Sequence, residues 1–306
     1  MKELIDFGSY AIKATLKKLL QDKSTNKNII WATNTYEDLG PEFDDKRQIE
    51  AYIFERGFKL EPRTYKSAEA QLARTKKKAE VFTPSWVVNQ MNNFCDEDWF
   101  GRKDVFNIEK GNSWEPTEGN IAFEGKKWTN YIDSKRLEIT CGEAPFLVSR
   151  YDASTGDMLE PKSVRIGILD RKLRIVNENT DTKEDWIKWA IRAVESCYGY
   201  EYQGDNLLIA RINVLLTFVE YFEDRWKEEV DLKTLERLTK IICWNIWQMD
   251  GLTDTVPFGA PFEDKHQIDI LEFLGEEEKE PEAVACRIYD WRARKSLRFM
   301  DLKENE

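Results

Sequence analysis

The chain has 306 residues, of which 41% are hydrophobic and 34% charged, a composition typical of a globular protein with one large domain or two ordinary ones. It contains no apolar run of about 18 residues and no apolar stretch at its start, so we expect no membrane-spanning helix, no signal peptide and a cytoplasmic location. The net charge of −11 argues against tight DNA binding by the isolated chain, because neutralising phosphates supplies most of the affinity for DNA.

Cysteine and histidine content restricts the possible chemistry. The five cysteines are widely spaced and form no CxxC pair, which indicates reduced core thiols and predicts neither a disulfide framework nor a metal site. His266 is the only histidine and lies in a polar stretch, where a solvated loop is its expected setting. Catalysis by a serine or cysteine paired with histidine is therefore excluded unless His266 is the base.

The first 75 residues are expected to form a polar, helical extension. Helices are predicted at residues 11–21 and 44–56, and residues 60–64, with Pro62, interrupt the pattern.

A further helix is predicted to begin after Phe82, where Thr83 is a suitable N-cap and Pro84 a suitable first helical residue. By itself this pattern predicts only a capped helix. Residues 96–135 are rich in Trp, Gly, Asn and charged residues, and loops with short strands are expected there.

Residues 136–149 contain the most informative pattern of the chain. A short apolar strand is expected to end at Cys141 and Gly142, and a helix to follow with Phe146 and Leu147 as its first apolar residues. In α/β proteins a turn of this kind builds a cofactor pocket. Glycine lets the backbone approach the ligand, and the free N–H groups of the helix start point into the crevice.

Residues 152–183 are expected to be an inserted hairpin or irregular excursion, because the stretches 165–169 and 172–176 alternate between apolar and polar residues. A helix with an aromatic stripe is predicted from residue 184 onward.

A strand is predicted at residues 197–202, with Glu201 near its end, and a long helix from Gly204 carries an apolar stripe that would pack on a sheet. A carboxylate at a strand end can accept hydrogen bonds from both ribose hydroxyls of a nucleoside, and Glu201 is the candidate for this role.

The last predicted elements are a helix at 232–240, a buried strand at 241–252 that ends in Asp250 and glycine, and a strand at 284–291. An acid in the position of Asp250 can accept the exocyclic N–H of an adenine. Aspartate before glycine is also ordinary turn chemistry, and both readings stay open.

In their order along the chain, these elements resemble motifs X, I, II and III of the amino-DNA-methyltransferases that use S-adenosylmethionine. The second glycine of the family's motif I is an alanine here. Motif X is matched by Phe82, Thr83 and Pro84, motif I by Glu138, Cys141, Gly142, Phe146 and Leu147 with Ala144 in place of the glycine, motif II by Glu201, and motif III by Asp250.

The resemblance implies an α/β, Rossmann-like S-adenosylmethionine-dependent methyltransferase fold over residues 76–306, after the helical N-terminal extension 1–75. It also implies S-adenosylmethionine as the cofactor, with the ribose held by the motif II acid. The cofactor-binding residues that it implies are Phe82, Thr83, Glu138, Cys141, Gly142, Glu143, Ala144, Pro145, Glu201 and Asp250.

One motif of the family has no counterpart here. These enzymes align the target amine with an [Asn/Asp/Ser]-Pro-Pro-[Tyr/Phe] loop, and none of the nine prolines of this chain is adjacent to another. No catalytic residue is therefore assigned.

The resemblance then implies the cofactor-binding part of an adenine-specific DNA methyltransferase of a restriction–modification system. We expect it to be inactive without a catalytic and DNA-recognition part, which a missing region or a second subunit would bring. Two alternatives remain: a non-catalytic S-adenosylmethionine-binding interaction protein, and a pocket that binds another nucleoside or nothing.

Overall fold

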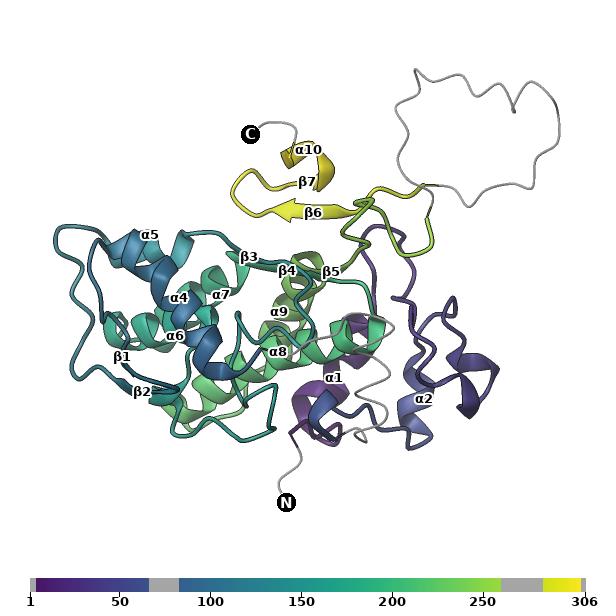
Figure 1. The fold of residues 1–306 in the computed structure, drawn as a ribbon, viewed down its shortest axis with the longest axis horizontal. Helices are drawn as coiled ribbons and strands as arrows, with labels where there is room; N and C mark the ends of the chain where they lie inside the picture. Colours follow the sequence, from purple (N-terminus) through teal and green to yellow (C-terminus); the bar gives the residue numbers. More distant parts are fainter. Residues whose placement is uncertain (1–3, 66–82, 260–282, 304–306) are drawn as a thin grey trace.

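The computed structural model describes residues 4–65, 83–259 and 283–303, and Figure 1 shows a mixed arrangement of helices and strands. The α-helices are α1 (Tyr10–Leu19), α2 (Ala51–Glu55), α4 (Ser85–Phe100), α5 (Trp128–Asp133), α6 (Ile168–Asn179), α7 (Lys183–Glu195), α8 (Gly204–Trp226), α9 (Leu232–Asn245) and α10 (Met300–Lys303). The short 3-10 helices are Glu37–Leu39, Pro41–Phe43, Arg63–Tyr65 and Lys162–Val164. The strands are β1 (Asn107–Lys110), β2 (Ser113–Pro116), β3 (Arg136–Glu138), β4 (Cys197–Glu201), β5 (Ile246–Gln248), β6 (Arg287–Asp290) and β7 (Lys295–Arg298).

A small parallel sheet lies at the centre of the fold. Its strands follow the order β3-β4-β5, with Leu137 paired to Tyr198 and Gly199 paired to Ile246. Parallel strands need crossover connections, and here α6 and α7 separate β3 from β4, while α8 and α9 separate β4 from β5. The carboxyl ends of the three strands therefore meet at one edge of the sheet.

The two faces of this sheet are covered by different structures. On one face, Tyr198, Tyr200 and Trp247 form a small apolar cluster with Ile288 and Phe299 in and beside the antiparallel hairpin β6–β7. Helices α8 and α9 cover the opposite face, as Figure 1 shows. A parallel sheet is normally buried on both faces, and in this protein a hairpin takes the place of a second helical layer.

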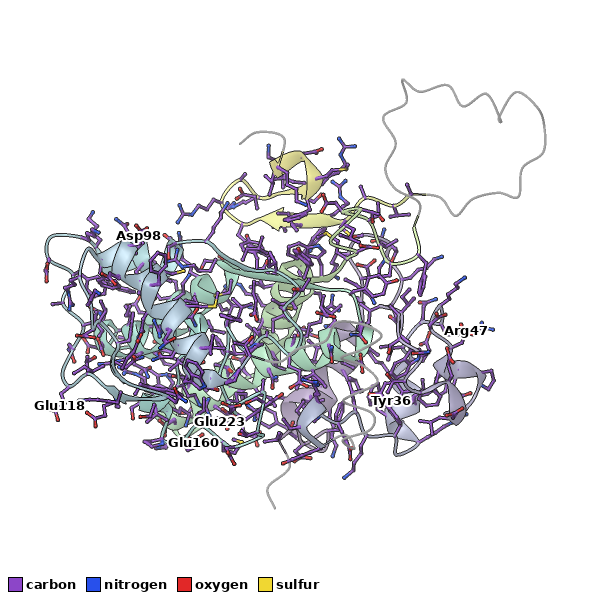
Figure 2. All side chains as sticks on the ribbon, in the orientation of Figure 1. Tyr36, Arg47, Asp98, Glu118, Glu160 and Glu223 are labelled. Atoms are coloured by element: carbon purple, nitrogen blue, oxygen red, sulfur yellow. The ribbon has the colours of Figure 1, made fainter. Side chains whose placement is uncertain are left out.

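The helical layer is built around α8, which is buried along most of its length and contacts α1, α6, α7 and α9. Two of these helices have side-chain N-caps. Asp231 accepts the Thr234 amide of α9 at 2.9 Å, and Thr182 accepts the Asp185 amide of α7 at 3.2 Å. Figure 2 shows side chains filling the space between the helices and the sheet, and Glu118 at the periphery is exposed.

The N-terminal segment is tied to the carboxyl edge of the sheet. Gln248, the last residue of β5, accepts the Ile30 amide at 2.9 Å and donates to the Ile30 carbonyl at 2.8 Å. The Gly204 amide donates to the Trp31 carbonyl at 2.8 Å. A Cβ at Gly204 would lie 2.0 Å from the Ile30 oxygen, so only glycine permits this approach. Apolar residues of the segment, such as Ile12, belong to the same core cluster as α8.

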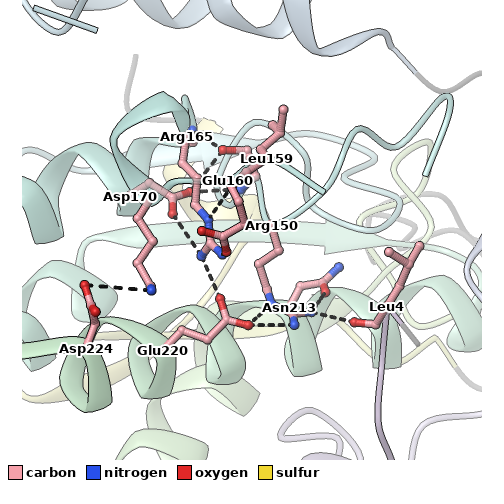
Figure 3. A network of polar contacts seen from close by, with 12 residues as sticks. Leu4, Arg150, Leu159, Glu160, Arg165, Asp170, Asn213, Glu220 and Asp224 are labelled. Atoms are coloured by element: carbon pink, nitrogen blue, oxygen red, sulfur yellow. Dashed lines mark hydrogen bonds and ion pairs between the residues drawn. The ribbon is translucent and has the colours of Figure 1, made fainter. Parts of the chain in front are cut away.

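A buried ion-pair network attaches the segment between β3 and α6 to α8 (Figure 3). The Glu220 carboxylate accepts from Nη2 of Arg150 and Nη1 of Arg165, each at 2.7 Å. Arg150 also donates to the Leu4 carbonyl at 2.9 Å and to the Asn213 side chain at 3.2 Å. Burial alone would raise the pKa of Glu220, but the two guanidinium groups hold it below its usual value. The network therefore joins the N-terminus, the segment after β3 and α8 through paired charges.

The predicted hairpin at residues 152–183 is wrong over much of its length, because residues 168–179 form helix α6. Leu169, Leu173 and Val176 are buried at helical spacing. The charged residues Arg171 and Lys172 are also buried, so the core face of the helix contains charges that hide its apolar period.

The predicted strand at 241–252 is largely wrong as well. Helix α9 continues to Asn245, and only Ile246–Gln248 form the strand β5. A short apolar run suits either a buried helix or a buried strand, and packing against α1 decides for the helix.

Other predicted elements differ mainly in length. The helix expected at 44–56 is reduced to α2, and the strand expected at 284–291 to β6. The helices expected at 11–21, from 184 and from 204, and the strand that ends at Glu201, are confirmed as α1, α7, α8 and β4. Within the described ranges, no helix has the length and apolarity needed to cross a membrane.

Replacing Glu220 with glutamine should destabilise the protein by about 2–4 kcal/mol, because the buried Arg150 would lose its counter-charge and Arg165 would keep only Glu160 and Asp170. Urea unfolding at pH 7 measures this change. The control is Asp224→Asn on the same helix, since Asp224 is 58% exposed and pairs near the surface with Lys227 at 3.3 Å and Lys162 at 3.8 Å, and it should cost less than about 0.5 kcal/mol. Equal losses in the two variants would contradict a stabilising role for the network.

Candidate functional site

A pocket of about 660 Å³ lies at the carboxyl ends of β3 and β4. Helix α4 and strand β3 form its walls, together with the turn after β3 and the start of α8. Its lining residues are Thr83, Met91, Asn92, Cys95, Arg136, Leu137, Glu138, Ile139, Thr140, Cys141, Gly142, Pro145, Phe146, Leu147, Ile168, Glu201, Tyr202, Gln203 and Asn206.

The Glu201 carboxylate joins the ends of two neighbouring strands. Its Oε2 accepts the Gly142 amide at 2.9 Å, across 59 residues of sequence, and its Oε1 accepts the Gln203 amide at 3.0 Å. Gly142 has a φ of 55°, in the left-handed region that glycine adopts without strain. Glu201 is only 6% exposed, and these two hydrogen bonds hold its carboxylate against the pocket wall.

The second carboxylate of the pocket belongs to Glu138, the last residue of β3. Its two oxygens accept the amides of Phe146 and Leu147 at 3.2 and 3.1 Å. Burial raises the pKa of Glu138 to about 8, the two amides oppose this rise, and the charge of Glu201 adds to it. The pocket therefore contains two buried acids that lie close enough for the negative charge of Glu201 to raise the pKa of Glu138.

Cys141 lies between these acids as part of the wall. Its amide donates to the Tyr200 carbonyl at 2.8 Å, which extends the contact between β3 and β4 by one residue. A Cβ at Gly199 would come within 3.3 Å of Cys141 Sγ, so the absence of a side chain in the middle of β4 makes room for the thiol. Burial raises the pKa of the Cys141 thiol, which keeps it protonated and unreactive.

The structure brings six of the sequence-predicted site residues to this pocket: Thr83, Glu138, Cys141, Gly142, Pro145 and Glu201. Phe82 lies outside the described residues, as does His266.

Three other predicted residues lie outside the lining. The Glu143 carboxylate accepts the Arg63 amide at 2.7 Å and the Tyr151 hydroxyl at 2.6 Å. Ala144 is fully buried with a φ of 64°. The Asp250 Oδ1 accepts the Leu252 amide at 2.9 Å, which is the turn chemistry that the sequence left open as an alternative.

The predicted helix after Gly142 is not formed. A single turn, closed by the Val148 amide and the Ala144 carbonyl at 2.9 Å, is followed by irregular chain and the short 3-10 helix Lys162–Val164 before α6 begins. The amides that a helix N-terminus would present are bound instead by Glu138. The N-cap of helix α4 is also displaced by one residue. Thr83 was predicted as the cap, but α4 begins at Ser85 and its N-cap is Pro84.

The start of helix α4 was predicted as part of the site, but the wall that its residues Met91, Asn92 and Cys95 provide was not. Asn92 donates to the carbonyls of Phe146 and Ile166, both at 3.0 Å, and so joins α4 to the turn after β3. Met91 and Cys95 lie one helical turn apart on the same wall. The local sequence predicts where helix α4 begins, but the face of α4 that meets the pocket depends on its tertiary partners.

Comparisons of the chain with protein-family models, with curated proteins and with solved structures returned no significant match. Within the described part of the chain, no group of three or more His, Cys, Asp or Glu side chains could hold a metal ion.

Replacing Glu138 with glutamine should change the pH dependence of stability. The folded protein keeps a proton on Glu138 up to about pH 8, whereas the unfolded chain releases it near its ordinary pKa of 4.5. The free energy of unfolding should therefore decrease as pH rises between these values, with a contribution of about 1.4 kcal/mol per pH unit from this group. Glu138→Gln should lack that contribution. Urea unfolding of both proteins across this range tests the prediction, and parallel profiles would contradict a proton on Glu138.

Proposed function

We propose that the pocket binds S-adenosylmethionine and that the chain is the cofactor-binding part of an adenine-specific DNA methyltransferase from a cytoplasmic restriction–modification system. The observation that carries the proposal is the hydrogen bond between Glu201 and the Gly142 amide, which joins an acid at one strand end to the glycine turn of the next strand. A Rossmann-like fold is supported by the parallel order β3-β4-β5 and by the acids that end β3 and β4.

The pocket suits the cofactor in size and charge. Its volume of about 660 Å³ lies within the range of about 300–1,000 Å³ for small-molecule sites. Glu201 ends strand β4 at the wall of the pocket, and a carboxylate in that position can accept hydrogen bonds from ribose hydroxyls. S-adenosylmethionine also carries a sulfonium and an ammonium group, and a negative charge on Glu201 favours such cations.

The remaining contacts would come from the turn and from α4. Gly142 leaves room for close approach of the ligand to the backbone, and Thr83 and Pro145 complete the walls. When bound, S-adenosylmethionine would supply an electrophilic methyl group, and the residues of this chain would bind and orient it. Asp250 and Glu143 take no part in this proposal, because neither lines the pocket.

The proposal includes a partner that supplies the amine-aligning loop. The chain contains no adjacent prolines and has a net charge of −11, so DNA contacts and alignment of the target amine are assigned to another polypeptide region.

Purified chain should bind S-adenosylmethionine, and Glu201→Gln should weaken that binding by about 1–3 kcal/mol, the range for a lost charge-assisted hydrogen bond. Isothermal calorimetry gives the affinities. Thermal unfolding gives a second readout, because a ligand at a hundredfold excess over its Kd adds about 2.7 kcal/mol of stability. No heat and no thermal shift at millimolar ligand would refute the proposed cofactor.

Glu143→Gln is the matched control for this experiment. Glu143 is another buried acid that accepts a backbone amide, one residue from Gly142, but it does not line the pocket. It should lose stability and keep its affinity for the cofactor. If Glu201→Gln shows that same pattern, Glu201 has a structural role alone.

The chain alone should not transfer a methyl group to DNA, because alignment of reacting groups contributes about 7–11 kcal/mol to rate enhancement and the aligning loop has no counterpart. Transfer of labelled methyl groups to adenine-containing duplexes, with and without a candidate partner chain, measures this. Label on DNA with the chain alone would show that another segment does the alignment. Pro257 and Phe258 would then be the first residues to replace, because they follow Asp250 and form a pair of proline and an aromatic residue.

A further inference from the structure

A pocket of about 290 Å³ lies at the opposite end of the central sheet from the site described above. Two of its lining residues, Lys135 and Ser196, directly precede β3 and β4, so it lies at the amino ends of these parallel strands. Its other walls come from the end of α5, the last turn of α7 and the turn of the hairpin β6–β7. This amino-end pocket shares no lining residue with the pocket at the carboxyl ends.

Four cationic side chains from three parts of the chain line the amino-end pocket. They are Arg192 of α7, Lys135 before β3, and Arg292 and Arg294 of the hairpin turn. The hairpin region is itself basic, because residues 287–303 contain six basic and two acidic residues. The local charge therefore attracts anions, although the whole chain carries a net charge of −11.

The two acids of this pocket leave much of the cationic surface free. Asp133 accepts Nε and Nη2 of Arg192 at 2.8 and 2.7 Å and lies 3.0 Å from Nη2 of Arg292. Among the described residues, Nη1 of both guanidinium groups has no acceptor, and Arg294 forms no hydrogen bond or ion pair. Burial raises the pKa of the second acid, Glu195, which disfavours its negative charge.

A buried cation lies directly behind the wall of the pocket. The ammonium group of Lys172 donates to Ser196 Oγ at 2.5 Å. It also donates to the carbonyls of Ile132 and Ser134 at 3.1 and 2.6 Å. These acceptors are neutral, and burial lowers the pKa of Lys172 to about 8. The carbonyl groups at the end of α5 are thus bound from inside by Lys172, and they do not offset the cations that face the pocket.

Tyr198 and Trp291 form the apolar part of the pocket. The Tyr198 hydroxyl donates to the Tyr289 carbonyl at 3.1 Å, and Trp291 Nε1 donates to the Asn245 side chain at 2.7 Å. Because both polar atoms have partners, these side chains present mainly their rings. The pocket volume is close to the lower limit of about 300 Å³ for small-molecule sites, which leaves room for an organic group beside an anion.

We propose that the amino-end pocket binds a small phosphomonoester, with its phosphate held by the four cationic side chains and its organic group against Trp291. Guanidinium groups match the geometry of phosphate oxygens. The three terminal oxygens of a phosphomonoester can accept from α7, the hairpin turn and Lys135 at the same time, whereas a carboxylate has only two oxygens.

The phosphomonoester site does not depend on the proposed function. S-adenosylmethionine carries no phosphate and is assigned to the carboxyl ends of β3 and β4, at the other edge of the sheet. Glu201→Gln should therefore keep the affinity for a phosphomonoester, and Arg294→Gln should keep the affinity for S-adenosylmethionine, so that either proposal can fail while the other holds.

Phenyl phosphate is the probe, because it carries no nucleoside that could enter the other pocket. Isothermal calorimetry at fixed ionic strength should show that phenyl phosphate binds the full chain more tightly than inorganic phosphate, and that phenol does not bind at millimolar concentration. The first comparison distinguishes a phosphomonoester from the free ion, and the second shows that the phosphate is required.

Two variants test the cations from separate elements. Arg294→Gln and Lys135→Gln should each weaken phenyl phosphate binding at least about fivefold. Arg294 has no partner among the described residues, so its replacement should leave the thermal unfolding midpoint unchanged. Arg298→Gln is the matched control, because Arg298 belongs to the same hairpin, pairs with Asp301 at 2.7 Å and does not line the pocket. It should change the affinity by less than about twofold.

The proposal is overturned if phenyl phosphate does not bind at millimolar concentration. Equal affinity for inorganic phosphate would make the free ion the ligand and would also overturn it. If Arg298→Gln weakens binding as much as Arg294→Gln, the attraction comes from the general charge of the hairpin, and the pocket has no specific role.

Discussion

Buried side-chain acceptors hold the segment between β3 and α6, and the pocket depends on them. Residues 141–151 and 165–167 of this segment are mostly buried but lie outside helices and strands, so their amides need other partners. Glu138, Glu201 and the hydroxyl of Ser149 supply them. The amides that they bind are those of Gly142, Phe146, Leu147, Ile166 and Gly167.

The same carboxylates give the pocket its character. Glu138 and Glu201 support the backbone of the turn from inside, and both also line the cavity. A cation or a hydroxyl donor that enters the pocket would therefore contact the groups that shape the turn. Ligand binding and the stability of this segment are coupled for that reason, since whatever changes the charge on either acid also changes its hold on the amides.

The small size of the sheet gives the site two different surfaces. The carboxyl ends of β3 and β4 carry the acids and the glycine turn, which suits a polar small molecule. Leu137 and Ile139, both partly exposed, line the same pocket opposite α4, which gives it an apolar wall. A sheet with a further strand beside β3 would have only the first of these surfaces.

The sequence by itself determined the features that depend on short-range patterns. The strand that ends at Glu201, the amphipathic helices α1, α7 and α8, and the glycine turn at Gly142 follow from apolar spacing and from the backbone freedom of glycine. Tertiary structure alone decided which acids face the pocket. Glu143 differs from Gly142 by one position, but its carboxylate binds the Arg63 amide. Tertiary structure also decided the formation of helix α6 and the extra length of α9. Buried charges such as Lys172 in α6 obtain their partners only from distant segments of the chain, and a local sequence pattern cannot contain that information.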